Sequence, residues 1–435
     1  MADRIRQTLG RLIRAYPWLG WLKLNLGVKR WVVLLFMGIV ALGLGMAFLL
    51  VDVYREGALP PALQALTLQF LPHWARALLL GLAGAGAVAV ALWQLSDTLL
   101  SPFAGSGRPI VKMVADYRRK GRGPKVVAIG GGTGMATLLR GLKRHTSNIT
   151  AIVTVADDGG SSGRLRRSLG VLPPGDFRNC IAALADDEAL ITQLFQYRFG
   201  AGDGLEGHSF GNLFISAMAE VTGSFERALV ESSRVLTIQG RVIPATVQDV
   251  TLVGDLRSPE AVYRVEGESA IPAATGSIER VFLQPDDAPA YPEAVQAILA
   301  ANLIVAGPGS LYTSVIPNLL VRDIAAAVRA SRAVKVYVCN VATQPGETDG
   351  YSVLDHVKAL EQHAGEELFP IVVANDRPEG ELLPGLQWVK FDPPLNGSKR
   401  LILADVAQRD RPWRHDSTKL ANLLIKLIEE NLVTL

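Results

Sequence analysis

Glycine-rich and polar segments recur directly after short β-branched runs in the second part of this 435-residue chain. The first, GGGTG, follows the run VVAI at 126–129. Glycines let a backbone approach a phosphate, and a helix that begins there presents free N–H groups. The spacing fits neither a Walker A loop nor a dinucleotide fingerprint. It predicts a phosphate-binding turn, or else a tight structural turn, at four residues: Gly131, Gly132, Thr133 and Gly134.

An acidic pair, Asp157 and Asp158, follows the second such run. Carboxylates at this place in an α/β fold bind ribose hydroxyls or a divalent cation. The next residues, GGSSG, have the letters of a nucleophile elbow, but Asp-Asp-Gly-Gly separates the run from the serines, which disfavours a hydrolase. We therefore predict ligand contacts for Asp157, Asp158 and Ser161, with a loop of solvated acids as the alternative.

Two further polar segments each precede a helical pattern. Asp176 stands where it would cap a helix, but capping does not account for Arg178 and Asn179 beside it. His208 opens a run of small polar residues that reaches Asn212. We expect these polar side chains to face a ligand, with a purely structural histidine as the alternative for His208.

The last two segments carry hydroxyl and amide groups. Gly309, Ser310 and Thr313 belong to GPGSLYTS, whose N–H and O–H groups suit a phosphate or diphosphate. Asn340 and Thr343 follow the next predicted strand, where an ordinary loop is the alternative. Ligands of an open parallel sheet lie beyond the carboxyl ends of its strands, so all these segments should converge.

The elements that must position these residues alternate between strand and helix over 125–435, which predicts an α/β fold. We expect a Rossmann-like parallel sheet with a helical insertion over 176–237 and a small antiparallel insertion over 241–283. Strands are expected at 126–129, 149–156, 281–283, 303–306, 334–338 and 371–374, and helices at 135–145, 322–331, 351–363 and 416–430.

The first 100 residues have a different character. Trp31 to Val51 and Ala77 to Ser96 carry no charged residue, and about 20 apolar residues suffice for a helix to cross a bilayer. We predict two transmembrane helices at about 31–53 and 75–96, followed by a basic juxtamembrane linker at 101–124 that suits anionic lipid. Seven Lys and Arg precede the first span and seven follow the second, against two between them. The positive-inside rule then places both termini in the cytoplasm, in a protein of the cell membrane.

Charge and cysteine content exclude other classes. Residues 1–124 have a net charge of +10, whereas residues 125–435 have a net charge of −7. A nucleic-acid-binding protein is expected to be basic on its main domain, so no nucleic-acid partner is predicted. Two cysteines are too few for a disulfide framework or a cysteine-rich zinc site.

Seven segments together closely resemble the YvcK-type gluconeogenesis factor family, within the CofD-like, or 2-phospho-L-lactate transferase-like, superfamily. The resemblance spans about residues 125–432 and leaves the N-terminal hairpin outside as an added anchor. The segments are VVAIGGGTGMATLLRGLKRH, ITAIVTVADDGGSSGRLR, PPGDFRNCIAALA, HSFGNLF, GPGSLYTSVIPNLLV, NVATQPGETDGY and RHDSTKL.

The resemblance implies a regulator that binds a nucleotide-linked sugar, typically UDP-N-acetylglucosamine, and adjusts carbon flux to the cell wall and cell shape. It implies that Arg414 lies near the ligand and that Ser417 or Thr418 is a phosphorylatable hydroxyl. The expected partners are a UDP-sugar or other nucleotide diphosphate, a second copy of the chain and cell-wall pathway proteins, together with membrane lipid, which the N-terminal residues suggest.

The superfamily offers an enzymatic alternative, a phosphotransferase that uses a nucleotide diphosphate donor. Asp157 and Asp158 would then hold Mg²⁺, the one cofactor considered, which would offset the charge of the diphosphate. The segment TQPGETDGY resembles the regulator branch and favours binding over turnover. A dinucleotide-dependent dehydrogenase fits less well, because the glycine spacing is wrong.

Overall fold

The computed structural model describes residues 120–185, 190–391 and 399–433, with nine single positions before them (39, 40, 43, 47, 72, 75, 82, 86 and 90). The chain divides into two units, Met1–Arg119 and Lys120–Leu435. The predicted membrane helices and basic linker fall almost wholly outside the described residues. Within the described part, no single helix is long and apolar enough to cross a membrane. One pair of helices, Leu311–Leu320 and Arg322–Ala330, is together long and apolar enough, but the two are bent by 79° relative to each other.

The second unit is built on a seven-stranded sheet with the order β10-β9-β8-β7-β1-β2-β3, and neighbouring strands are parallel. β1 lies inside the sheet and is buried along its whole length, which is typical of a parallel strand covered on both faces. The predicted Rossmann-like α/β fold is therefore confirmed. The strands are β1 (Val126–Gly130), β2 (Ile149–Val153), β3 (Arg241–Pro244), β7 (Leu303–Ala306), β8 (Val334–Val338), β9 (Ile371–Asn375) and β10 (Arg400–Ala404).

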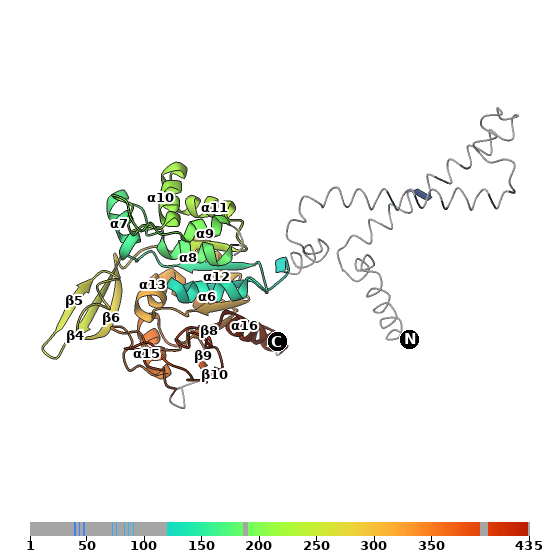
Figure 1. The fold of residues 1–435 in the computed structure, drawn as a ribbon. Helices are drawn as coiled ribbons and strands as arrows, with labels where there is room; N and C mark the ends of the chain where they lie inside the picture. Colours follow the sequence, from blue (N-terminus) through green and yellow to red (C-terminus); the bar gives the residue numbers. More distant parts are fainter. Residues whose placement is uncertain are drawn as a thin grey trace. The chain divides into compact units, whose positions relative to one another are not determined.

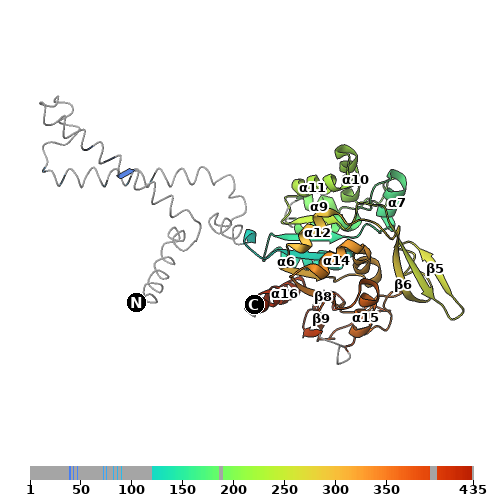
Figure 2. The same ribbon diagram turned by 180° about the vertical axis from the view of Figure 1, so that it is seen from behind.

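A three-stranded antiparallel sheet, ordered β5-β4-β6, forms the predicted small insertion. It projects from the side of the domain in both views (Figures 1 and 2). β4 is its central strand and supplies most of its buried positions, whereas β5 is largely exposed. The strands are β4 (Thr251–Arg257), β5 (Val262–Glu266) and β6 (Ser277–Gln284).

Helices form around the sheet where apolar residues recur at helical spacing. α6 (Gly132–Leu142) buries Met135, Leu138, Leu139 and Leu142 completely. The predicted helical insertion is also present and carries α8 to α11, which gather beside α7 at one end of the domain (Figure 1). The helices are α6, α7 (Gly160–Leu169), α8 (Gly175–Leu184), α9 (Leu190–Gln196), α10 (Phe210–Thr222), α11 (Phe225–Val235), α12 (Pro292–Leu299), α13 (Ile316–Leu320), α14 (Arg322–Ala330), α15 (Val353–Ala364) and α16 (Ser417–Val433).

Three strand predictions need correction. The second strand ends at Val153 rather than residue 156, because the Thr154 hydroxyl accepts the Ala156 N–H at 3.2 Å and turns the chain. Arg241–Pro244 was expected in the antiparallel part but is an edge strand of the main sheet, where its exposed Arg241 and its proline are tolerated. β10 was not predicted, because it is half-exposed and lacks a fully apolar run.

Candidate functional site

The carboxyl ends of β1, β7 and β8 open into a cleft of about 250 Å³. Each strand contributes the loop that follows it, and a segment near the C-terminus closes the remaining side. The lining residues are Gly132, Thr133, Gly134, Thr137, Pro308, Gly309, Ser310, Asn340, Val341, Ala342, Thr343, Gln344, Leu386, Trp413, Arg414 and His415.

The N-terminus of α6 forms one wall of this cleft. Gly131 has no side chain to cap it, and Asp176 accepts the Gly132 N–H. The other residues of the first turn, Thr133 and Gly134, line the cleft together with the positive end of the helix dipole. A β-carbon on Gly134 would lie 2.5 Å from the Pro308 carbonyl oxygen. Only glycine therefore allows the first turn of α6 and the loop after β7 to touch, which brings two predicted phosphate-binding segments together.

Asn340 holds the loop after β7 in place. Its side chain accepts the Gly309 N–H at 3.3 Å and donates to the Gly309 carbonyl at 2.9 Å. It also donates to Gln344 at 3.0 Å, and Gln344 donates to the Ser310 hydroxyl at 2.7 Å. The Gly309 N–H and the amide side chains of Asn340 and Gln344 are thus already used within the protein.

Thr313, a predicted ligand contact, lies below the cleft and not in its lining. It is buried in the π-helix Leu311–Val315 and donates to Glu347 at 2.9 Å. Glu347 also accepts the Tyr312 N–H at 3.2 Å, and burial raises the pKa of its carboxyl group. Thr313 therefore fixes the π-helix to the segment that follows β8.

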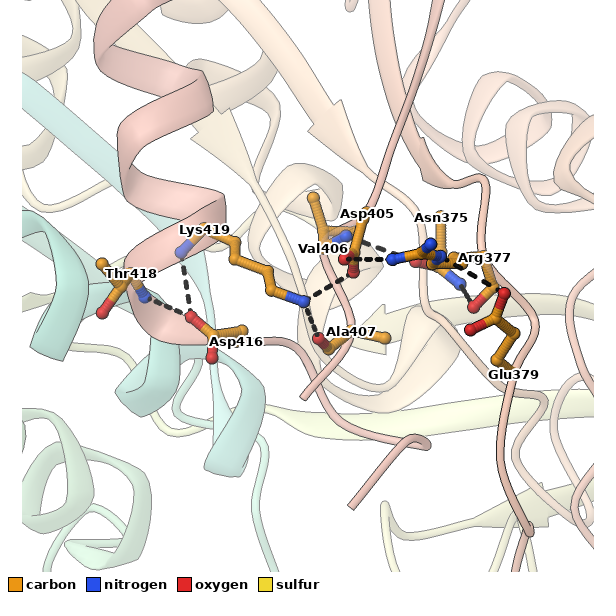
Figure 3. Close-up of polar contacts among 9 residues, drawn as sticks. All are labelled: Asn375, Arg377, Glu379, Asp405, Val406, Ala407, Asp416, Thr418 and Lys419. Atoms are coloured by element: carbon orange, nitrogen blue, oxygen red, sulfur yellow. Dashed lines mark hydrogen bonds and ion pairs between the residues drawn. The ribbon is translucent and has the colours of Figure 1, made fainter. Parts of the chain in front are cut away.

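Residues 405–419, which we call the strap, carry Arg414 to the cleft. The strap is pinned at its two ends: Lys419 donates to Asp405 at 2.7 Å and to the Ala407 carbonyl at 2.9 Å (Figure 3). Asp416 accepts the backbone N–H groups of Thr418 and Lys419, which caps the start of α16.

Inside the strap, the Gln408 N–H donates to the Arg414 carbonyl at 2.8 Å. His415 is buried and its Nε2 lies 3.1 Å from the Cys339 carbonyl oxygen, so it donates to the end of β8. Burial lowers the pKa of His415 to about 4, which keeps the ring neutral. The strap therefore presents an exposed guanidinium, Arg414, opposite the N-terminus of α6.

A group of carboxylates lies behind this cleft. Burial first, and the charge of Asp157 second, raise the pKa of Asp176 to about 6, although its carboxylate accepts the Gly132 N–H. Burial raises the pKa of Asp157 as well. Glu268, from the loop after β5, is affected most: burial and then the charges of Asp157, Asp176 and Asp158 raise its pKa to about 8. Around neutral pH these carboxyl groups therefore carry less negative charge together than the same number of exposed carboxyl groups would.

The predicted metal ligands are occupied by backbone contacts. Asp157 accepts the Gly159 N–H at 2.9 Å, and Asp158 accepts the Ser269 N–H at 2.9 Å. Among the described residues, no group of three or more His, Cys, Asp or Glu side chains is placed to hold a metal ion. One oxygen of each of the two aspartates is thus engaged by a backbone N–H.

A buried polar network surrounds Ser161. Arg164 Nε donates to His208 Nε2 at 3.1 Å, so the neutral ring carries its proton on Nδ1 and donates it to Ser161, 2.9 Å away. Asn212 also donates to the Ser161 hydroxyl, at 3.0 Å. His208 therefore cannot take a proton from Ser161 in this arrangement, which agrees with the sequence argument against a hydrolase.

The structure separates the predicted site residues into two groups. Those that line the cleft are Gly132, Thr133, Gly134, Gly309, Ser310, Asn340, Thr343 and Arg414. Those that lie outside its lining are Gly131, Asp157, Asp158, Ser161, Arg178, Asn179, His208, Asn212 and Thr313.

The predicted phosphorylatable residues, Ser417 and Thr418, start α16 beside the strap. The Thr418 hydroxyl accepts from Arg144 at 2.8 Å. Sequence reasoning missed Trp413, Gln344 and Glu268 as site residues. The first two lie next to predicted positions, which was an available signal, but nothing in the sequence around Glu268 links it to the acidic pair.

Comparison with known proteins decides the family. The model of 2-phospho-L-lactate transferase CofD matches residues 126–433. The gluconeogenesis factor of Bacillus subtilis is 47% identical over 320 residues, which cover 71% of this chain and 100% of that protein. The chain belongs to the gluconeogenesis factor family, within the CofD-like superfamily.

Two further relatives show how far the likeness extends. A relative from Nostoc sp. is 46% identical over 432 residues, covering 95% of this chain and 93% of its own length, so that alignment also includes N-terminal residues. A crystal structure of a Bacillus halodurans protein is 44% identical and superposes with a TM-score of 0.66, covering 70% of this chain and 100% of that one. The family fold therefore resides in the second unit.

Proposed function

We propose that this protein is a nucleotide-sugar-binding regulator, of the UDP-N-acetylglucosamine type, that adjusts carbon flux to cell-wall synthesis and cell shape. The observation that carries the proposal is the cleft that the first turn of α6 and Arg414 both line. A helix N-terminus and an arginine are suited to opposite sides of a diphosphate. The half-buried Trp413 and Leu386 provide apolar surface for a ring of the same ligand.

The relatives' name supports the physiological part of this proposal, since a Bacillus subtilis protein that this chain covers completely is a gluconeogenesis factor. The two uncharged N-terminal runs and their basic flanks support attachment to the cell membrane, with the binding domain in the cytoplasm. Candidate partners are membrane lipid, a second copy of the chain and enzymes of the wall pathway.

The test is a calorimetric titration of the full chain in detergent with UDP-N-acetylglucosamine, GDP and NAD, with and without Mg²⁺. We expect the UDP-sugar to bind without turnover. Arg414→Ala should weaken binding about 10- to 100-fold, because a hydrogen bond to a charged group contributes about 1.5–3 kcal/mol. Arg409→Ala, an exposed arginine of the same strap outside the cleft lining, is the matched control and should bind normally.

A second candidate function, a phosphotransferase using a nucleotide diphosphate donor, is favoured by the carboxylates behind the cleft. Mg²⁺-dependent binding of GDP together with product formation would establish it. No response to the UDP-sugar under the same conditions would then refute the regulator.

A further inference from the structure

Three arginines and one histidine lie near one another outside the cleft, on α7 and the helical insertion. Arg164 comes from α7, Arg178 from α8 and Arg198 from the segment after α9, while His208 precedes α10. The positive charge of Arg198 acts on both Arg178 and His208, and that of Arg164 on His208. The four side chains therefore share one electrostatic environment.

None of these arginines forms a direct ion pair within the part of the chain that the structure describes. Their acceptors are neutral instead. Arg164 donates to His208 and to the Glu206 carbonyl at 3.0 Å, Arg178 to Asn179 at 2.7 Å, and Arg198 to the Gly207 carbonyl at 2.5 Å.

Arg178 is the least satisfied member of the group. Its Nε atom is buried and has no hydrogen-bond acceptor. Burial lowers the pKa of its guanidinium, and the charge of Arg198 lowers it further, whereas the carboxylates of Asp176 and Asp157 act in the opposite direction without forming an ion pair with it. A buried donor of a charged group that lacks an acceptor is destabilising, so an oxyanion placed here would remove a penalty as well as bind.

The backbone is shaped to hold this side chain. A β-carbon on Gly211 would lie 2.8 Å from Arg178 Cγ and would also overlap the Phe195 carbonyl oxygen. Gly207 has a positive φ of 75°, and its β-carbon would lie 3.1 Å from Arg164 Nη2. Glycines thus make room for the stem of Arg178 and for the guanidinium group of Arg164, which distinguishes the group from arginines scattered on a surface.

We propose that Arg164, Arg178, Arg198 and His208 form a second anion-binding site, separate from the cleft and specific for a phosphoryl or carboxylate group. Three guanidinium groups offer several free N–H donors, which suits the oxygens of phosphate. Neutral His208 accepts from Arg164 at Nε2 and donates to Ser161 from Nδ1, and Asn212 holds Ser161 in turn. This site does not depend on the proposed function of the cleft.

The test uses inorganic phosphate as the probe and the full chain in detergent. Phenylglyoxal modifies arginines, and peptide mass spectrometry gives a rate for each. With phosphate at about ten times its dissociation constant, modification at positions 164, 178 and 198 should slow about tenfold, because only the unoccupied fraction reacts. Exposed Arg227 on α11 is the internal control, and chloride at equal ionic strength controls for screening.

Arg198 is exposed, so Arg198→Gln is compatible with folding; this variant should remove the protection of Arg164 and Arg178, whereas Arg227→Gln should retain it. Equal rates with phosphate and chloride, or equal protection at Arg227, would overturn the proposal. Arg414→Ala should leave the protection unchanged. Failure of the UDP-sugar titration would therefore not be confused with failure of this site.

Discussion

Removing the charge of Glu268 should stabilise the protein in alkaline solution and have little effect in acid. Glu268 lies near three other carboxylates, those of Asp157, Asp158 and Asp176. Within the described part of the chain, its side chain has no hydrogen-bond partner. Glu268→Gln keeps its size and polarity but removes the carboxylate that these neighbours repel.

The magnitude follows from the shift in pKa. The pKa of Glu268 is about 8 in the folded protein, against an ordinary value of 4.5. The folded protein therefore binds this proton more tightly than the unfolded chain does. The associated stability is fully present below pH 4.5 and is lost as pH rises to about 8. At 1.36 kcal/mol per pKa unit, the difference of about 3.5 between the two pKa values gives an upper limit of about 5 kcal/mol for the loss.

The assay is thermal unfolding of the full chain in detergent at pH 5 and pH 8.5, for the wild type, Glu268→Gln and Glu260→Gln. For a domain of this size about 1 kcal/mol shifts the midpoint by about 2 °C, so Glu268→Gln should unfold several degrees higher than wild type at pH 8.5 and about equally at pH 5. Glu260, exposed in the same insertion, is the control. A Glu268→Gln protein that gains no stability at pH 8.5, or gains it equally at both pH values, would refute the electrostatic reasoning.

Two other substitutions test how the cleft is built. Gly134→Ala should push Pro308 away from α6. Overpacking should lower the free energy of unfolding by about 1–3 kcal/mol, which the higher helix propensity of alanine offsets only in part. Calorimetry should show weaker UDP-sugar binding together with a lower unfolding midpoint. Lys419→Ala should release Asp405 and loosen the strap, and UDP-sugar affinity should fall because Arg414 is no longer held in place. Lys419→Arg should restore part of the affinity. Equal affinity for wild type and Lys419→Ala would show that the ion pair does not position Arg414.

The convergence of the phosphate-binding segments was predictable because of a topological rule. Gly134 and Asn340 are 206 residues apart in the sequence, and Ser310 lies between them. Each of the three follows a parallel strand, and the carboxyl ends of parallel strands meet at one edge of the sheet. Glycines and hydroxyls after apolar runs are a strong local signal for such loops.

Other site residues could not be predicted, for reasons that concern packing. Whether Thr313 faces a ligand or the protein depends on Glu347, which comes from a different strand end. Glu268 reaches the acidic pair only because the loop after β5 folds back so that Ser269 donates to Asp158. The spacing of residues within one segment predicts neither the direction of a side chain nor its contacts with a distant segment.

The carboxylates behind the cleft should make the proposed binding of a UDP-sugar depend on pH. A diphosphate between α6 and Arg414 would lie near Asp176, whose carboxylate accepts the Gly132 N–H at the edge of the cleft. As pH rises through about 8, Glu268 loses its proton and adds a negative charge to this region. The affinity for a UDP-sugar should therefore fall between pH 6.5 and pH 9, and the fall should be smaller in Glu268→Gln. Titrations of both proteins at the two pH values measure it, and an equal fall in both would show that Glu268 is not the group responsible.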